Sequence, residues 1–106
     1  MVRHDLRVLL VCGSGASSGF MAANMRKASK ELGYDFDVEA RGSSEIESHI
    51  DDVDVIMVGP HMEYIMDEAK ELTEGTGVKA ILMKPDYYSH LDGKKAIEHL
   101  LEELKG

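Results

Sequence analysis

The sequence predicts a single α/β domain in which a four-stranded parallel sheet carries helices on both faces. Short apolar stretches typical of buried strands alternate with stretches whose apolar residues recur at steps of three and four, the spacing of a helix face. The chain has 106 residues, of which 43% are hydrophobic, so one domain over residues 1–106 can build its own core. Strands that alternate with helices are joined by right-handed crossovers, which produce a parallel sheet.

Each expected strand is an apolar or alternating run that ends at turn residues. The four strands are expected at Arg7–Val11, Phe36–Ala40, Val53–Val58 and Lys79–Met83. The helices between and after them are expected from Ser17 or Ser18 to about Leu32, from Glu45 to about Ile50, from Pro60 to Leu72 and from about Asp92 to Leu104. Serines at positions 17, 18, 43 and 44 are candidate helix caps, and Pro60 suits a first helical turn. The sheet would be open and flavodoxin- or Rossmann-like.

A single cysteine follows the first strand and opens a loop of small residues. The strand delivers Cys12, and the residues after it are Gly13, Ser14, Gly15, Ala16, Ser17 and Ser18. A strand, a loop of small residues and a helix form the arrangement that directs backbone N–H groups and a helix N-terminus at an anion. These six residues are therefore the candidate phosphate-binding loop, and Cys12 is the candidate reactive residue.

The loop favours a reactive thiol at Cys12 over a buried, inert one. A free cysteine at a strand end is often only a small core residue. Helix N-termini and clustered N–H groups, however, lower the pKa of a thiol from about 8.5. The same field would stabilise a phosphoryl group on that sulfur, which carries a charge of about −2. A phosphocysteine therefore fits the loop.

Other known loop motifs fit the residues after Cys12 less well than a phosphocysteine loop does. A Walker A loop needs Gly-Lys-Ser/Thr, and no lysine follows these glycines. The spacing from Gly13 to Gly19 is one residue too long for a dinucleotide fingerprint. Low-molecular-weight tyrosine phosphatases are similar, but they have an arginine where this chain has Ser18, and the guanidinium clamps the transition state. A phosphatase-like hydrolase and a phosphate- or nucleotide-binding regulatory module remain the alternatives to a phosphoryl carrier.

Three stretches in the same order resemble one protein family. They are the opening V-L-L-V-C-G-S-G-A-S-S, the strand D-V-I-M-V-G-P with the following H-M-E-Y-I-M, and the late Tyr88 with Leu91-Asp92-Gly93. Together they resemble the enzyme IIB component of the lactose/cellobiose class of the bacterial phosphoenolpyruvate-dependent sugar phosphotransferase system. The chain departs from that family at His61, where glutamine is common.

The resemblance implies that the domain shuttles phosphate. Cys12 would accept a phosphoryl group from a phosphohistidine on enzyme IIA. It would pass this group to a sugar bound by the membrane-embedded enzyme IIC, such as cellobiose, lactose, chitobiose or a related β-glucoside. Neither a metal nor a cofactor is implied by this transfer, which depends on positioning and on charge stabilisation.

Further candidate residues lie at the predicted C-terminal edge of the sheet, where ligands bind in open α/β folds. Pro60 and His61 follow the third strand, and Tyr88 and Asp92 follow the fourth. They are candidates for contact with the phosphoryl group or a partner protein, and ordinary solvent-exposed loop positions are the alternative. A hydrolase triad of Cys12, His61 and an aspartate is not required by their spacing.

Charge and composition exclude several classes of partner. The net charge of −8 argues against nucleic acid, because phosphate backbones need a basic surface. The longest apolar run is far shorter than the roughly 20 residues of a membrane-spanning helix, so no direct membrane insertion is expected. A polar N-terminus and one cysteine predict a cytoplasmic protein that meets the inner face of the membrane only transiently.

Overall fold

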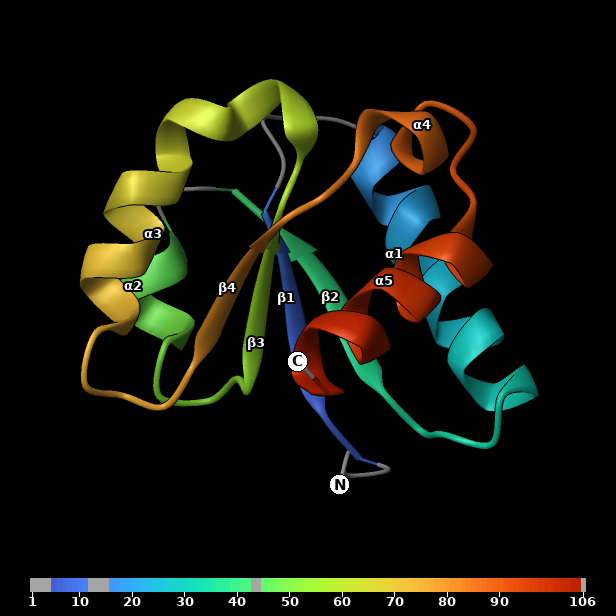
Figure 1. Cartoon of the computed structure of the whole chain (residues 1–106), viewed down its shortest axis with the longest axis horizontal. Coiled ribbons are helices and arrows are strands. Elements are labelled where there is room, and N and C mark those ends of the chain that lie inside the picture. The colour runs from blue at the N-terminus through green and yellow to red at the C-terminus, as the bar shows by residue number, and fades with distance from the viewer. Residues whose placement is uncertain (1–4, 12–15, 43–44, 106) are drawn as a thin grey trace.

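A parallel four-stranded sheet runs through the middle of the molecule and is covered by helices on both faces (Figure 1). The structure is a computed structural model, and it describes residues 5–11, 16–42 and 45–105. The strands are β1 (Arg7–Val11), β2 (Asp37–Arg41), β3 (Val55–Val58) and β4 (Lys79–Leu82). They are ordered β2-β1-β3-β4, so β1 and β3 occupy the centre. The predicted open α/β fold is confirmed.

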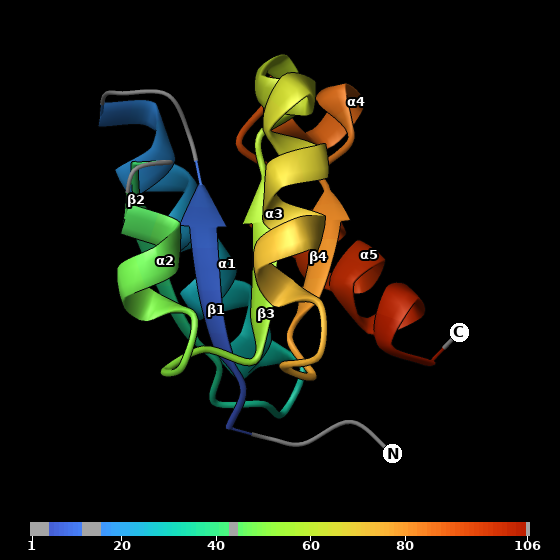
Figure 2. The ribbon, with the colours of Figure 1, turned by 90° about the vertical axis from the view of Figure 1, so that its left-hand side faces the viewer.

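The helices divide between the two faces of the sheet. They are α1 (Ala16–Glu31), α2 (Ile46–His49), the 3-10 helix η2 (Pro60–Ile65), α3 (Met66–Thr73), α4 (Pro85–Tyr88) and α5 (Gly93–Lys105). Figure 2 shows α2 and α3 in front of the sheet, with α1 and α5 behind it. In the described part of the chain, no helix is long and apolar enough to cross a bilayer.

Alternate residues of β1 supply two separate cores, as a strand buried on both faces should. Val8 and Leu10 lie in the core beneath α1 and α5, together with Met21 and Met25. Leu9 and its neighbour Val11 lie in the core beneath α2 and α3. The strand is therefore apolar at consecutive positions because each of its two faces packs against a layer of helices.

The helix expected over Pro60–Leu72 is instead two helices. A 3-10 segment comes first, with non-helical dihedrals at Met62 (φ −116°, ψ 34°), and the α-helix begins only at Met66. The buried side chains explain the change. Met62, Ile65 and Ala69 are all buried, and the kink at Met62 changes the direction of the chain between the first of them and the other two. The apolar side chains on either side of the kink therefore all face the sheet without one continuous helical repeat.

Two local expectations on α1 were wrong. The helix begins at Ala16, so Ser17 and Ser18 lie within its first turn and do not occupy the N-cap position. In the sequence, Phe20, Met21 and Met25 recur at helical steps, which predicts that Phe20 shares their buried face. Phe20 is instead 63% exposed, because Met21 and Ala22 turn inward in its place. The proposed caps Ser43 and Ser44 lie outside the described residues.

Candidate functional site

The predicted reactive residue lies between the end of β1 and the start of α1. Cys12 and the loop residues Gly13, Ser14 and Gly15 are outside the described residues. The backbone of Ala16, Ser17 and Ser18 forms the first turn of α1. The described structure therefore fixes the two ends of the segment that contains the cysteine.

The end of β1 lies directly beside the end of β3. The backbone N–H of Gly59 donates to the carbonyl of Val11, the residue before Cys12, at 2.9 Å. The N–H of Met83 donates in turn to the carbonyl of Val58 at 2.8 Å. The segments that leave β1, β3 and β4 therefore start side by side, at the edge where the sequence predicted a site.

Electrostatics at the start of α1 favour an anion. The helix has 16 residues, and its first turn contains no acidic side chain. The first N–H groups of a helix have no partner within it and carry a partial positive charge of about half a unit, which stabilises negative groups placed within reach of the first turn. A carboxylate in that turn would have cancelled part of this field.

Two of the predicted site residues meet at this edge, although they are 27 positions apart. His61, exposed on η2, places its ring 5.5 Å from the ring of Tyr88 on α4, centroid to centroid, at an angle of 47°. This distance is within the range of favourable aromatic contacts. Pro60, half-buried, occupies the first position of η2 and so starts the helix that presents His61.

Asp92 has a structural role at the start of α5. Its Oδ1 accepts the backbone N–H of Lys95 at 3.1 Å, which is the geometry of a cap at the start of α5. Its neighbour Gly93 packs against the backbone of Asn24, eight residues into α1. At 1.5 Å per residue, Asn24 is about 12 Å along the helix from Ala16.

A buried polar pair behind Tyr88 was not found from the sequence. The hydroxyl of Tyr87, which is 3% exposed, lies 2.6 Å from Nδ1 of His99 on α5. Burial raises the pKa of Tyr87 to about 12. Burial, with the charge of Lys84 second, lowers the pKa of His99, so at neutral pH the Tyr87 hydroxyl shares its hydrogen bond with a neutral imidazole, and the tautomer of the ring sets which group donates.

Sequence reasoning also missed two exposed aromatic side chains. Phe20 on α1 and Tyr64 on η2 are 63% and 75% exposed. Tyr64 was visible in the H-M-E-Y stretch, but its exposure depends on the 3-10 turn that buries Met62 and Ile65. The pairing of Tyr87 with His99 had no comparable signal, because the two residues lie on different helices.

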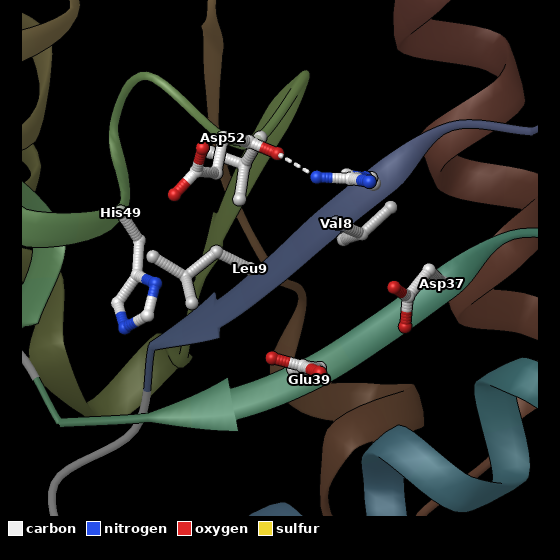
Figure 3. Close-up of a pocket in the computed structure, with 8 residues that line it drawn as sticks. Val8, Leu9, Asp37, Glu39, His49 and Asp52 are labelled. Atoms are coloured by element: carbon white, nitrogen blue, oxygen red, sulfur yellow. Dashed lines mark hydrogen bonds between the residues drawn. The ribbon is translucent and has the colours of Figure 1, made fainter.

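The cavity in Figure 3 is elsewhere, over the N-terminal halves of β1 and β2. It measures about 370 Å³ and lies where the short helix α2 leaves the sheet face open. Nη1 of Arg7 donates to the carbonyl of Asp52 at 3.4 Å on its rim, and Asp37, Glu39 and His49 complete its polar lining. In the described part of the chain, no group of three or more His, Cys, Asp or Glu side chains could hold a metal ion.

Known proteins with similar sequences are components of sugar phosphotransferase systems. The oligo-beta-mannoside-specific EIIB component of Bacillus subtilis is 24% identical over 90% of this chain and 92% of its own length. The galactose-specific EIIB component of Lactococcus lactis is 26% identical over 88% and 91%. The lactose-specific EIICB component of Lacticaseibacillus casei is 28% identical, and the match covers 96% of this chain but only 18% of that longer protein.

Solved structures show the same fold. The lactose-specific IIB domain from Streptococcus pneumoniae superposes with a TM-score of 0.82 at 20% identity, over 92% of this chain and 96% of that one. The cellobiose-specific IIB protein from Borrelia burgdorferi gives a TM-score of 0.70 at 22% identity, over 89% and 86%. The protein-family model for the lactose/cellobiose-specific IIB subunit of the phosphotransferase system (PTS) matches residues 7–99 of this chain. The chain therefore belongs to the lactose/cellobiose-specific IIB family of the sugar phosphotransferase system.

Proposed function

We propose that this IIB subunit is a phosphoryl carrier in which Cys12 is the carrier residue. The observation that carries the proposal is the position of the only cysteine. It directly follows β1 and is four residues before α1, whose first turn contains no acidic side chain. A thiolate and a phosphoryl group both gain from the partial positive charge of that helix end.

The proposed donor is a phosphohistidine of an enzyme IIA protein. The sulfur of Cys12 attacks phosphorus as the P–N bond breaks, and the imidazole leaves with the proton that the thiol gives up. In the second step, the hydroxyl oxygen of a sugar attacks phosphorus, the S–P bond breaks, and the hydroxyl proton returns to sulfur. Both steps balance without an oxidant, a metal or a cofactor, because each exchanges one phosphoryl group for one proton.

The loop after Cys12 would hold the phosphoryl oxygens. Backbone N–H groups of Gly13 through Ser18, with the hydroxyls of Ser17 and Ser18, are the proposed donors. Ser17 and Ser18 lie in the first turn of α1, where N–H groups have no partner within the helix. The absence of an arginine at position 18 disfavours hydrolysis, because a phosphatase loop of this kind uses a guanidinium to stabilise its transition state.

His61 and Tyr88 are proposed to contact the phosphoryl group or the partner protein beside it. Their rings are in contact on η2 and α4, next to the edge at which β1 ends. Pro60 would act indirectly by starting η2. The fourth predicted residue, Asp92, is not included, because its carboxylate caps α5.

The proposed acceptor is a sugar held by a membrane enzyme IIC. Relatives named EIICB components support this partner, since each contains a segment like this chain within a longer protein. Relatives are named for oligo-beta-mannoside, lactose, galactose and cellobiose. We propose cellobiose, lactose, chitobiose or a related β-glucoside as the sugar, transferred on the cytoplasmic face of the membrane.

Intact-protein mass spectrometry tests the carrier function. The full chain is incubated with phosphoenolpyruvate, enzyme I, HPr and a cellobiose-type IIA, and compared with a Cys12→Ser variant and a reaction without IIA. A gain of one phosphate that requires both IIA and Cys12 supports the carrier. Absence of the adduct with several IIA proteins, in a folded sample, would overturn it, and turnover of p-nitrophenyl phosphate by the wild type would instead favour a hydrolase.

A further inference from the structure

The short helix α4 lies between α5 and η2, and two consecutive tyrosines make its contacts. Tyr87 turns inward, and its hydroxyl reaches His99 of α5 at 2.6 Å. Tyr88 is partly buried, packs against the core beneath α1 and α5, and places its ring against His61 of η2. Figure 1 shows α4 beside the start of η2, at the end of the molecule where the strand arrowheads point.

A four-residue helix does not fix its own position. Only a few backbone hydrogen bonds hold it, among them those from the N–H of Ser89 to the carbonyl of Pro85 and from the N–H of Asp92 to the carbonyl of Tyr87. Isolated helices of this length are unstable in water, so tertiary contacts decide where α4 lies. The contact with α5 is buried and directional, whereas the contact with η2 is a ring packing at the surface.

The Tyr87–His99 bond is suited to positioning because its geometry is restrictive. A phenylalanine at position 87 would fill nearly the same volume without orienting the helix. A buried hydroxyl must instead find its acceptor, since leaving it unpaired is costly. The acceptor is itself confined, because the His99 side chain is 10% exposed and its Nε2 lies 4.0 Å from Oε2 of Glu103.

We propose that Tyr87 and His99 are positioning residues that hold α4 so that Tyr88 keeps His61 in place at the edge of the sheet. Neither residue touches the phosphoryl group in this scheme, and both act through the ring contact between Tyr88 and His61. The functional part of this inference rests on the proposed carrier function.

Three variants of the Tyr87–His99 pair and one control variant separate positioning from general stability. Tyr87→Phe removes the hydroxyl from this hydrogen bond, and His99→Leu removes the ring nitrogen. His99→Asn places an amide oxygen close to where Nδ1 was and should rescue the contact. Ile56→Val is the matched control, because it removes one methyl group from the opposite core, beneath α2 and α3, and lowers stability without touching α4.

The first measurement is the nuclear Overhauser effect between the ring protons of Tyr88 and His61 in the full chain. We expect it to weaken at least about threefold in Tyr87→Phe and His99→Leu, and to persist in His99→Asn and Ile56→Val, since interproton effects fall steeply when rings separate. An unchanged effect in both disrupting variants would overturn the inference, whatever the phosphorylation assays show.

The second measurement is phosphoryl transfer from phosphorylated IIA. Misplacing a contact residue should lower the limiting rate about tenfold in the two disrupting variants while KM for IIA changes less than about twofold. An equal loss of rate in Ile56→Val would show that stability alone is responsible and would overturn the inference. A wild type that accepts no phosphate contradicts the carrier function instead, and the ring contact then decides the positioning role alone.

Discussion

Gly93 at the start of α5 lies so close to Asn24 of α1 that no side chain fits between the two helices. A Cβ atom added to Gly93 would be 2.3 Å from the carbonyl carbon of Asn24 and 2.4 Å from its oxygen. The amide of Asn24 also donates to the carbonyl of Leu91 at 2.8 Å, which fixes the chain on its approach to α5. This close approach of the two helices explains why position 93 is a glycine.

Gly93→Ala should therefore destabilise the protein by about 3 kcal/mol, because backbone atoms must move to admit the methyl group. Urea denaturation followed by circular dichroism measures the change. The matched control is Gly19→Ala, also within a helix, where no atom in the described part of the chain, apart from the helix's own backbone and the two adjacent residues, lies within 4 Å of the added carbon. This control should raise stability by about 0.5 kcal/mol, since alanine is the better helix former. Equal stability of the two variants would contradict the packing argument.

Asp92→Ala should lower stability by about 1 kcal/mol by removing the cap of α5. Asp92→Asn keeps a side-chain oxygen for the N–H of Lys95 and should remain within about 0.5 kcal/mol of the wild type. The rate of phosphoryl transfer should be unchanged in both, because the cap is distant from the start of α1. A transfer rate that falls while stability is kept would return Asp92 to the partner surface for which the sequence made it a candidate.

The strands were predictable because each is specified by local pattern. The bounds of β1 agree with those expected from the sequence, since a run of apolar residues buried on both faces has few alternatives. β3 begins at Val55 and not at Val53; just before it, the carboxylate of Asp54 accepts the N–H of Arg7 at 2.9 Å, and the backbone N–H of Asp54 donates to the carbonyl of Arg7 at 2.8 Å. The start of β3 therefore depends on Arg7, which is 47 positions away, and no local sequence pattern reveals such a contact.

The features around the candidate site depended on tertiary contacts and were harder to predict. The helix α4 was not among the expected helices, because four residues that begin with a proline give no helical repeat. Its position is determined by Tyr87 and Tyr88, whose partners are on α5 and η2. The sequence did predict that His61 and Tyr88 would reach the same edge, because strand topology alone brings the segments after β3 and β4 together.

The stability of the protein should fall in acid partly because of His99. Burial lowers the pKa of His99 below its ordinary value of 6.5, so the unfolded chain binds this proton at a higher pH than the folded one. Stability therefore declines as the pH falls from about 6.5 towards the folded pKa, and this group adds no slope above that window. The charge of Lys84 acts in the same direction, while Glu103, Glu102 and Asp86 oppose it.

Urea titrations between pH 7.5 and 4.5 measure this effect as the difference between the wild type and His99→Leu. The variant lacks the titrating group, so its stability should change less steeply over the window. Parallel curves for the two proteins would show that His99 titrates alike in the folded and unfolded chains, contrary to its burial.

The role of His61 can be separated from stability because its side chain is exposed. His61→Ala should leave the free energy of unfolding within about 0.5 kcal/mol of the wild type. If His61 contacts the phosphoryl group or IIA, the same change should slow transfer about tenfold, the loss expected for one hydrogen bond of about 1.4 kcal/mol. His61→Gln, the residue common in the family at this position, retains a side-chain N–H donor and should recover most of the rate. Rapid-quench measurement of phosphocysteine formation distinguishes the two variants.

Equal rates for the wild type, the alanine variant and the glutamine variant would exclude a contact in the transfer step and leave His61 as a surface residue packed on Tyr88.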